Sequence, residues 1–381
     1  MKIASVVGTR PNFMKLAPLA REFAKRADVE HIVIHTGQHY DATMSDAFFH
    51  DLAIPAPQYS LAVGSGSHAA QTAAVLARIE PVLEAERPDM VLVYGDVNST
   101  LAAALAAAKM FLPVAHVEAG LRSRDRTMPE EINRLVTDQL ADLLFAPSPD
   151  AVANLRAEGI PAARIHFAGN IMIDVLKAAL PAVRRLDVPA RFGLSERRYV
   201  VATLHRPANV DDPGRLRELV AALDHLSRER PVLFPVHPRT RQRMHDLKIS
   251  PGTIGALRLL DPVGYTEMLG LVAASEFVIT DSGGLQEETT YLGIPCVTVR
   301  PNTERPITCT QGTNRLVAPE RNAILDAAKA AVASRPMSPP IIERWDGRTA
   351  ERIAAVLCDG ASFDAWHDTA ASGPQRALIE V

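Results

Sequence analysis

Cysteine is scarce in this chain of 381 residues, which contains only three, at positions 296, 309 and 358. No pair of them has the Cys-x-x-Cys spacing, and an odd, sparse set argues against a disulfide framework. Such a composition is typical of proteins that are kept in a reducing compartment. We therefore expect a cytoplasmic location.

Long hydrophobic runs and an excess of one charge are also missing. The most apolar stretch, 101–117, is interrupted by Lys109 and Pro113, and no run reaches the roughly 20 residues that a membrane-spanning helix needs. The beginning of the chain has the pattern of a first strand that ends at a Gly turn, not of a signal peptide. Lys and Arg number 41 against 44 Asp and Glu, so no basic field would hold nucleic acid or an anionic membrane surface. We predict no nucleic-acid partner and no membrane partner.

Short apolar runs alternate with longer helical patterns along the chain. The strands predicted in the first half lie at 2–7, 31–35, 90–94, 113–117 and 142–146. Those predicted in the second half lie at 199–204, 232–236, 256–260, 276–280 and 295–299. Because these runs are continuously apolar, they favour parallel sheets that are covered by helices on both faces.

The chain is long enough for about two domains. We predict an α/β fold with two Rossmann-like, doubly wound domains, over 1–170 and 171–346, joined where the helical pattern loosens at 169–196. The segment 347–381 holds a last helix that could pack on either domain, the N-terminal domain being the candidate. A cleft faced by the carboxyl ends of both sheets is the expected ligand site, as is usual for such folds.

The end of the first predicted strand suggests a phosphate contact. This strand ends in Gly8-Thr9-Arg10, and Lys15 follows in the next helix. Backbone amides at a Gly turn and a helix start can bind an anion, and the two basic side chains add charge. An ordinary strand–helix turn with an exposed arginine is the alternative.

A second phosphate contact is predicted where a later strand runs into a helix through Ser282, Gly283 and Gly284. Two glycines allow close approach of a ligand, and the N-terminus of a helix favours a diphosphate. Glu288 follows one turn into that helix, either to reach a ribose or to compensate the helix dipole, and Arg305 could return to the phosphate. No Gly-x-Gly-x-x-Gly follows the first strand, which argues against NAD or FAD. The predicted ligand is a nucleoside diphosphate, and no cofactor is expected.

Three carboxylates are candidates for acid–base chemistry. Asp96 and Glu118 follow adjacent predicted strands, and Glu130 opens a helix. Adjacent parallel strands end side by side, so Asp96 and Glu118 should approach each other and repel until one of them holds a proton near neutrality. Such a group suits the abstraction and return of a proton. Taken alone, Glu130 is better explained as a first-turn helix acid, and a turn role for Asp96 stays open.

Histidines add one candidate and one exclusion. His205 ends a strand of the second half, and it could donate to a phosphate or act as an acid–base group, a histidine bonded to local backbone being the alternative. His35 and His39 have i, i+4 spacing, but they span a strand end and a Gly turn instead of a helix, so we predict no metal site.

These candidates lie in ordered motifs that together resemble the non-hydrolysing UDP-N-acetylglucosamine 2-epimerase family, over residues 1–360. The motifs are GTRPNFMKLAPL, TGQHYD, GDVNST, HVEAGLRS, MPEEINR, TLHRP, TDSGGLQEE, NTERP and GTN. The resemblance implies two Rossmann-like domains as in GT-B glycosyltransferases, a homodimer, and a role in cell-surface polysaccharide biosynthesis. It further implies interconversion of UDP-GlcNAc and UDP-ManNAc without NAD or a metal.

The family's chemistry breaks the anomeric C–O bond, eliminates UDP to give 2-acetamidoglucal, and adds UDP back with protonation of C2 on the other face. By resemblance, Asp96, Glu118 and Glu130 are the essential carboxylates, and His205 is a histidine that activity requires near the diphosphate. The contacts to phosphate, sugar and UDP that the resemblance implies are Arg10, Lys15, Ser282, Gly283, Gly284, Glu288 and Arg305.

Three departures from the family pattern keep the substrate and its regulation open. Residues 206–209 read Arg-Pro-Ala-Asn where many bacterial members have Arg-Arg-Glu-Asn, and Tyr40-Asp41 replaces a polar pair. Residues 61–72 lack the Arg-Gln pair with which allosteric members hold a second UDP-GlcNAc, so we expect no requirement for UDP-GlcNAc as an activator. A modified substrate such as a UDP-2,3-diacetamido-hexuronic acid, a hydrolysing 2-epimerase, a GT-B glycosyltransferase and a non-catalytic nucleotide-sugar sensor are the alternatives.

Overall fold

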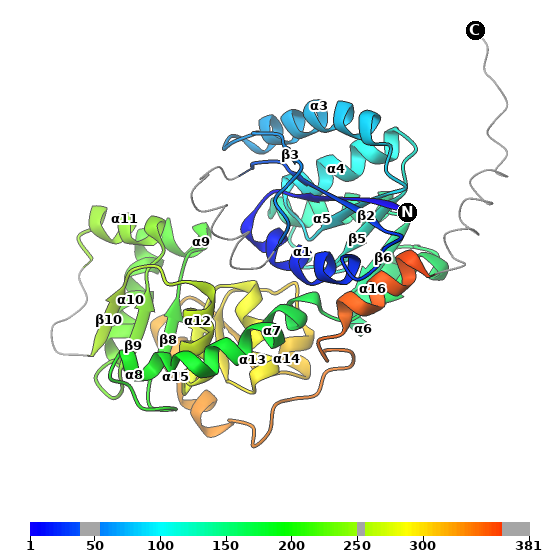
Figure 1. Ribbon diagram of the computed structural model, residues 1–381. Coiled ribbons are helices and arrows are strands. Elements are labelled where there is room, and N and C mark those ends of the chain that lie inside the picture. The colour runs from blue at the N-terminus through cyan, green and yellow to red at the C-terminus, as the bar shows by residue number, and fades with distance from the viewer. Residues whose placement is uncertain (39–53, 250–255, 360–381) are drawn as a thin grey trace, which may run out of the picture. The chain divides into compact units, whose positions relative to one another are not determined.

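The computed structural model describes residues 1–38, 54–249 and 256–359, which form two units with one parallel sheet each (Figure 1). The first unit comprises Met1–Gly120, Ile132–Ile171 and the chain from Arg348 on, and the second comprises Leu121–Glu131 and Met172–Gly347. The predicted α/β class with two Rossmann-like sheets is therefore confirmed. Among the described residues, no helix has the length and apolar character that crossing a membrane requires.

The first sheet has seven strands in the order β3-β2-β1-β4-β5-β6-β7. Its strands are β1 (Lys2–Val7), β2 (Glu30–His35), β3 (Tyr59–Ser60), β4 (Met90–Tyr94), β5 (Val114–Val117), β6 (Leu143–Ala146) and β7 (Ile165–Phe167). The helices of this part of the chain are α1 (Arg10–Phe23), α3 (His68–Glu86), α4 (Asn98–Lys109), α5 (Pro129–Leu140), α6 (Pro149–Ala157) and α16 (Thr349–Cys358), with a 3₁₀ turn at Ala162–Arg164. The strand order reverses between β1 and β4, which is where doubly wound sheets bind their ligands.

The second sheet has six strands in the order β10-β9-β8-β11-β12-β13, and its reversal point lies between β8 and β11. Its strands are β8 (Val200–Thr203), β9 (Val232–Pro235), β10 (Leu257–Leu260), β11 (Phe277–Thr280), β12 (Cys296–Val299) and β13 (Asn314–Val317). Its helices are α7 (Ile171–Leu186), α8 (Val188–Arg191), α9 (Pro207–Val210), α10 (Pro213–Leu226), α11 (Pro238–Asp246), α12 (Tyr265–Ala273), α13 (Gly283–Leu292), α14 (Ile307–Thr310) and α15 (Arg321–Ala333).

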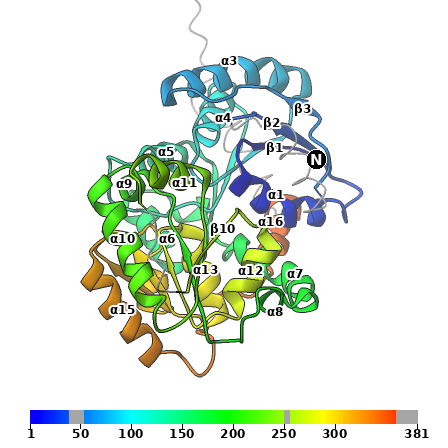
Figure 2. The ribbon, with the colours of Figure 1, turned by 90° about the vertical axis from the view of Figure 1, so that its left-hand side faces the viewer.

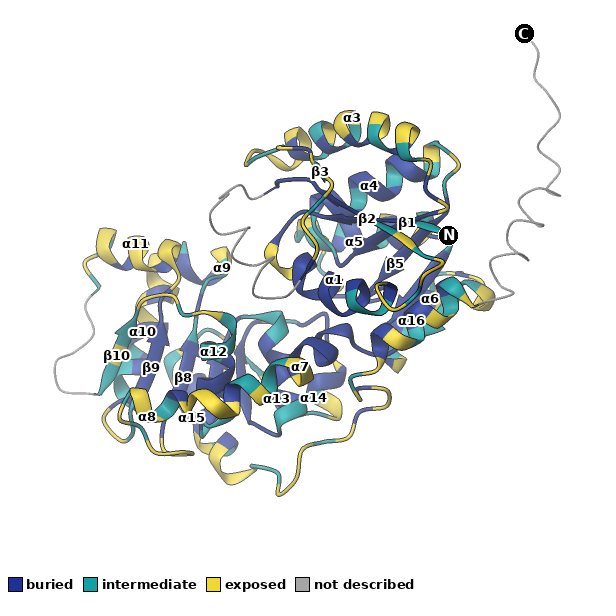
Figure 3. Cartoon of the chain, viewed as in Figure 1, coloured by how far each residue is buried: buried dark blue, intermediate teal, exposed yellow. Residues whose placement is uncertain are grey.

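Burial on both faces explains why the central strands are apolar without alternation. All five residues of β4 and all four of β11 are buried. The same holds for β9, which is drawn in the dark blue of buried residues in Figure 3. The last helix, α16, lies beside α1 (Figures 1 and 2), and Ile353 and Leu357 enter the core that Leu16 shares with the first sheet. Each such buried side chain stabilises the fold by about 1.5–3 kcal/mol.

The structure differs from the sequence prediction at the junction of the two halves. The sequence predicts no helix over 169–196, where the helical pattern loosens, yet most of this segment is helical, as α7 and α8. Ile173, Leu176 and Val183 form the buried face of α7 and pack into two small apolar clusters of the second unit. Pro181 and the charged residues interrupt the apolar period of this helix in the sequence. The helix forms nevertheless, because the burial of its apolar face stabilises it more than local propensity does.

Gly120 follows β5 with a φ of 85°, and a Cβ added there would lie 2.5 Å from the carbonyl oxygen of Ala151. We expect Gly120→Ala to lower the free energy of unfolding by about 2–5 kcal/mol, from the left-handed backbone together with overpacking against a main chain. Gly159 has a φ of 83° but no atom within 4 Å of an added Cβ. Gly159→Ala should therefore cost only about 1–2 kcal/mol, the backbone part. Urea unfolding measures both, and equal losses would show that the contact with Ala151 is unimportant.

Candidate active site

At the end of β1, the expected anion-binding amides already have a partner. The backbone N–H groups of Gly8 and Thr9 both donate to Oδ1 of Asn12, at 3.2 Å each. The Asn12 amide nitrogen in turn donates to the carbonyl of Tyr94 at 2.8 Å. Asn12 thus ties the β1–α1 turn to the end of β4, and the amides of Gly8 and Thr9 have a side-chain partner in this structure. Arg10 is the first residue of α1 and is exposed.

Lys15 and Glu118 lie together near the carboxyl ends of the central strands of the first sheet. They form an ion pair in which both side chains are more than nine-tenths buried. Glu118 has a φ of 73°, a left-handed backbone that is unusual for a residue other than glycine and that costs about 1–2 kcal/mol. Such strain persists where surrounding contacts hold a residue in place, and it is found frequently at functional sites. Lys15 therefore contacts a carboxylate in this structure instead of standing free for a phosphate.

Asp96 follows the neighbouring strand and is held by α5. Its carboxylate accepts a hydrogen bond from Arg134 at 2.5 Å, and its carbonyl oxygen accepts one from Asn133 at 2.8 Å. The sequence alone predicts that Asp96 and Glu118 repel each other. The structure instead gives each of the two carboxylates a cationic partner, Arg134 and Lys15.

Glu130 and Glu131 occupy the first turn of α5 and differ in their surroundings. Glu131 is buried and accepts hydrogen bonds from the backbone and hydroxyl of Ser123 and from the backbone of Arg124, at 2.9–3.0 Å. It thereby fastens the loop before the helix. Glu130 is half-buried, and a catalytic role for it stays a prediction.

In the second unit, His205 is oriented by Asp281. The Nδ1 atom of His205 lies 2.8 Å from the Asp281 carboxylate, which is fully buried and also accepts from the backbone N–H groups of His205 and Arg206. Burial would raise the pKa of Asp281, but these hydrogen bonds and the charge of His205 outweigh burial and hold the pKa below its usual value. The His205 side chain is 42% exposed, so its Nε2 is the atom that can face a ligand.

The N-terminus of α13 holds the predicted Ser-Gly-Gly sequence. Ser282 is the N-cap residue, and its hydroxyl makes no capping hydrogen bond. A Cβ on Gly283 would lie 2.7 Å from Nη1 of Arg305, whereas one on Gly284 would meet no atom within 4 Å. Arg305 therefore lies against the mouth of this helix, and the space beside Gly284 is open. Unpaired N–H groups and the dipole make such a helix end suitable for a diphosphate.

Buried carboxylates neutralise the arginines at this helix end. Arg305 contacts Glu287 at 2.8 Å and Glu304 at 2.5 Å, and Arg300 contacts Glu304 at 2.7 Å. Burial would raise the pKa of Glu304, but Arg305, Arg300 and Arg206 outweigh burial and hold the pKa far below its usual range.

Glu288 is buried one turn further along α13, where it accepts a hydrogen bond from the Tyr265 hydroxyl at 3.1 Å. A first-turn role as compensation of the helix dipole does not fit, because the first turn of α13 contains no acidic residue.

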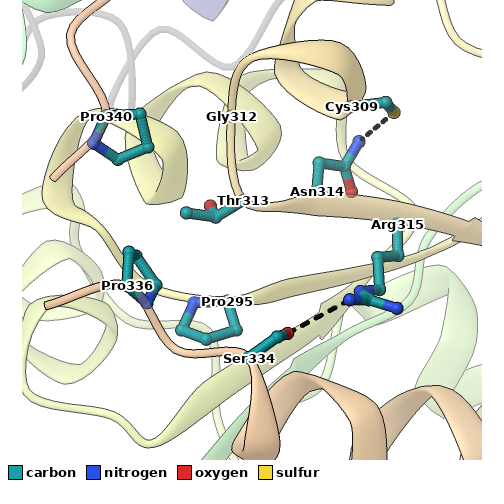
Figure 4. A pocket seen from close by; sticks show the side chains of 9 residues that line it. All are labelled: Pro295, Cys309, Gly312, Thr313, Asn314, Arg315, Ser334, Pro336 and Pro340. Carbon is teal, nitrogen blue, oxygen red and sulfur yellow. Dashed lines mark hydrogen bonds between the residues drawn. The ribbon is translucent and has the colours of Figure 1, made fainter.

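A cavity of about 280 Å³ lies elsewhere in the second unit (Figure 4). Pro295 and Thr313, which line it, precede β12 and β13, so the cavity opens at the amino ends of these strands. Arg315 at its wall donates to the Ser334 hydroxyl at 3.1 Å. The cavity therefore lies at the amino ends of the strands, whereas the predicted ligand groups follow the carboxyl ends.

Sequence reasoning missed several residues that hold the predicted ones in place. Arg134 and Asp138 lie four residues apart, on one face of the predicted helix at 129–141, and are fully or almost fully buried. The available signal was a set of polar side chains at helical spacing, since Glu131 and Thr137 lie on the same buried side of this helix. The predictions concerning His39, Tyr40 and Asp41 lie outside the described residues. Within the described part of the chain, no group of three or more metal-binding side chains occurs.

Two parallel sheets, each with its polar groups at the reversal point, define the class of two-Rossmann, GT-B-like proteins. The family model "UDP-N-acetylglucosamine 2-epimerase" matches residues 21–358. The chain belongs to this family of isomerases, so the resemblance inferred from its motifs is confirmed.

Relatives and solved structures support the assignment along most of the chain. A UDP-2,3-diacetamido-2,3-dideoxy-D-glucuronate 2-epimerase of Pseudomonas aeruginosa is 44% identical over 87% of this chain and 92% of its own. A UDP-N-acetylglucosamine 2-epimerase homolog of Methanococcus maripaludis is 44% identical over 86% and 91%. The crystal structure of Methanocaldococcus jannaschii UDP-GlcNAc 2-epimerase with UDP-GlcNAc and UDP has a TM-score of 0.86, at 40% identity, covering 94% of this chain and 100% of that one.

The charge balance around Glu304 predicts a large effect of its removal. Glu304→Gln leaves Arg300 and Arg305 buried without their shared anion, so we expect a loss of about 3–5 kcal/mol in the free energy of unfolding at pH 7. The folded pKa of Glu304 is depressed, so its contribution is present above the usual value of 4.5 and is lost as the pH falls further. The difference between variant and wild type should therefore narrow in acid.

The matched control is Glu229→Gln, because Glu229 pairs with Arg230 but is 60% exposed. It should change the stability by less than about 1 kcal/mol. Urea unfolding at several pH values tests both variants, and equal small effects would contradict the role given to Glu304.

Proposed function

We propose that this chain catalyses the reversible epimerisation of UDP-N-acetylglucosamine and UDP-N-acetylmannosamine at C2, by eliminating UDP and adding it back. The observation that carries the proposal is the end of the first sheet, where adjacent strands are followed by Asp96 and Glu118 and each acid has a basic partner. A glycosyl transfer needs an acceptor and one base, whereas several positioned acids suit proton movement on the sugar itself.

The second unit is proposed to bind the UDP part of the substrate. The diphosphate would lie at the N-terminus of α13, where the Ser282 hydroxyl and the amides beside Gly284 can donate hydrogen bonds. His205, oriented by Asp281, would add a donor through Nε2. Negative charge develops on UDP as it departs, so these groups would stabilise the transition state more than the ground state. Glu288 is the candidate for the ribose, and Arg305 holds the helix mouth.

Three acids near the ends of β4 and β5 and at the start of α5 are proposed to move the proton. In the elimination, the C2 proton passes to a carboxylate, the C2–H electron pair becomes the C1=C2 bond of 2-acetamidoglucal, and the C1–O electron pair leaves with UDP. In the return, a UDP oxygen attacks C1 and a proton reaches the other face of C2. Asp96, Glu118 and Glu130 are the candidate proton carriers, and Lys15 offsets the charge of Glu118.

Deuterium incorporation tests this chemistry. In deuterated water, UDP-GlcNAc alone should give UDP-ManNAc with deuterium at C2, followed by NMR. Asp96→Asn and Glu118→Gln should slow the exchange by about 10²–10⁴-fold, the usual contribution of a positioned acid or base, while UDP affinity is retained. Glu84→Gln, the same chemical change on the exposed face of α3, is the matched control.

Other outcomes of this experiment separate the alternatives. Free ManNAc with UDP would indicate a hydrolysing 2-epimerase, and substrate that reacts only after an acceptor is added would indicate a glycosyltransferase. Bound UDP without deuterium at C2 of any substrate would refute the proposal. Loss of UDP affinity in both carboxylate variants would assign them a structural role.

A UDP-2,3-diacetamido-hexuronic acid is the second candidate substrate. The relative of that name from Pseudomonas aeruginosa is 44% identical, the same value as the UDP-N-acetylglucosamine 2-epimerase homolog of Methanococcus maripaludis. Comparing kcat/KM for the two UDP-sugars decides between them, since discrimination appears in that ratio.

The same reaction tests the expectation that no activator is needed. Gln71 is buried, and its amide donates to the carbonyls of Gln38 and Gly64 and accepts from Asn98, so it is engaged within the protein. We expect UDP-ManNAc alone to react at its full initial rate without a lag. A lag that a trace of UDP-GlcNAc abolishes would contradict this expectation. The homodimer, the cytoplasmic location and the polysaccharide role stay predictions.

A further inference from the structure

A histidine and an aspartate that the proposed mechanism does not use are buried close to the proposed proton carriers, where they contact the backbone next to Asp96 and Glu118. His116 lies in β5, and Asp138 lies in α5; both side chains are fully buried. Nδ1 of His116 is 2.6 Å from an oxygen of Asp138, and Nε2 is 2.8 Å from the carbonyl oxygen of Gly95. The other oxygen of Asp138 accepts a hydrogen bond from the backbone of Gly120 at 3.0 Å.

The hydrogen bonds determine where the protons of this pair are. A carbonyl oxygen only accepts, so Nε2 of His116 carries a proton. The short contact between Nδ1 and Asp138 contains a second proton, on the ring or on the carboxyl. Both ring nitrogens are thus engaged within the protein and away from solvent. His116 can neither take nor give the proton at C2 of a sugar.

The atoms that the pair holds lie beside both carboxylates of the first unit. Gly95 precedes Asp96, and Glu118 and Gly120 follow His116 along the same strand end. Gly95, Glu118 and Gly120 all have left-handed backbones, with φ of 62°, 73° and 85°. Glycine adopts this backbone readily, whereas Glu118 keeps it only because surrounding contacts hold it there.

The helix α5 completes the arrangement from one face. Asn133 and Arg134 hold the backbone and the carboxylate of Asp96, and Asp138 lies one turn beyond Arg134. Residues four apart on a helix face the same side. One helix therefore fixes the end of β4 directly through Asp96, and the ends of β4 and β5 indirectly through His116.

We propose that the buried His116–Asp138 pair is a positioning device that holds Asp96 and Glu118 in register for the reaction, without itself transferring the proton. This inference rests on the proposed function. A displacement of about 1 Å in such groups can cost on the order of 10²-fold in rate, which sets the size of the expected effect.

Two substitutions of His116, each of which keeps one of its two hydrogen bonds, test the proposal. The amide nitrogen of a glutamine falls near the former Nε2, so His116→Gln can still donate to Gly95, while that of an asparagine falls near Nδ1, so His116→Asn keeps only the bond to Asp138. We expect His116→Gln to retain deuterium exchange within about tenfold, and His116→Asn and His116→Leu to lose about 10²-fold. The UDP Kd should be unchanged in all three, and urea unfolding shows the folded fraction.

Other results would overturn the proposal. If all three variants bind UDP but lose exchange as fully as Asp96→Asn, His116 takes part in the proton transfer. If His116→Leu exchanges at the wild-type rate, the pair positions nothing. Should the variants fail to fold, the wild-type protein still tests the bond to Gly95, because nitrogen-15 NMR should show a proton on Nε2 of His116; an Nε2 without a proton contradicts the inference. Absence of exchange in the wild type would instead refute the proposed function.

Discussion

Charge that is removed from water at the carboxyl end of a parallel sheet needs a compensating partner, because the desolvation cost is several kcal/mol for each ion. Both units meet this requirement in the same way. In the first, Glu118 has Lys15 and Asp96 has Arg134. In the second, Glu304 forms ion pairs with Arg300 and Arg305. A ligand that carries charge into either place therefore meets side chains whose positions are already determined by their partners.

The two sheets provide stiff supports for these charged groups. Strands buried on both faces end at the reversal points, and the helices that follow carry the groups: α5 supplies Asn133 and Arg134, and α13 supplies an open N-terminus. Catalysis by electrostatic stabilisation depends on dipoles and charges that do not reorganise during the reaction. The left-handed backbone at Glu118 belongs to the same pattern, since strain is tolerated where many contacts hold a residue.

Much of the fold could be predicted, because apolar runs of four to six residues directly reflect burial in a parallel sheet. β1 and β4 were predicted with the bounds that the structure shows. The elements that were not predicted include the short strands β3, β7 and β13 and the helices α6 and α7. Two to four strand residues carry little pattern, and the apolar face of α7 is interrupted by charge. The motif residues also identified the family, although a motif does not show which atom each side chain contacts.

The sequence by itself determined the alternation of most strands and helices, the absence of a dinucleotide fingerprint and the set of polar residues at strand ends. Only the tertiary structure decided the partners of those residues. Asn12 occupies the amides at Gly8 and Thr9, Lys15 contacts Glu118, and His116 connects β4 to α5. The reason is physical. Periodicity follows from local geometry and burial. A hydrogen bond between residues far apart in the chain requires atomic positions that are accurate to a few tenths of an ångström, and only the packed fold establishes them.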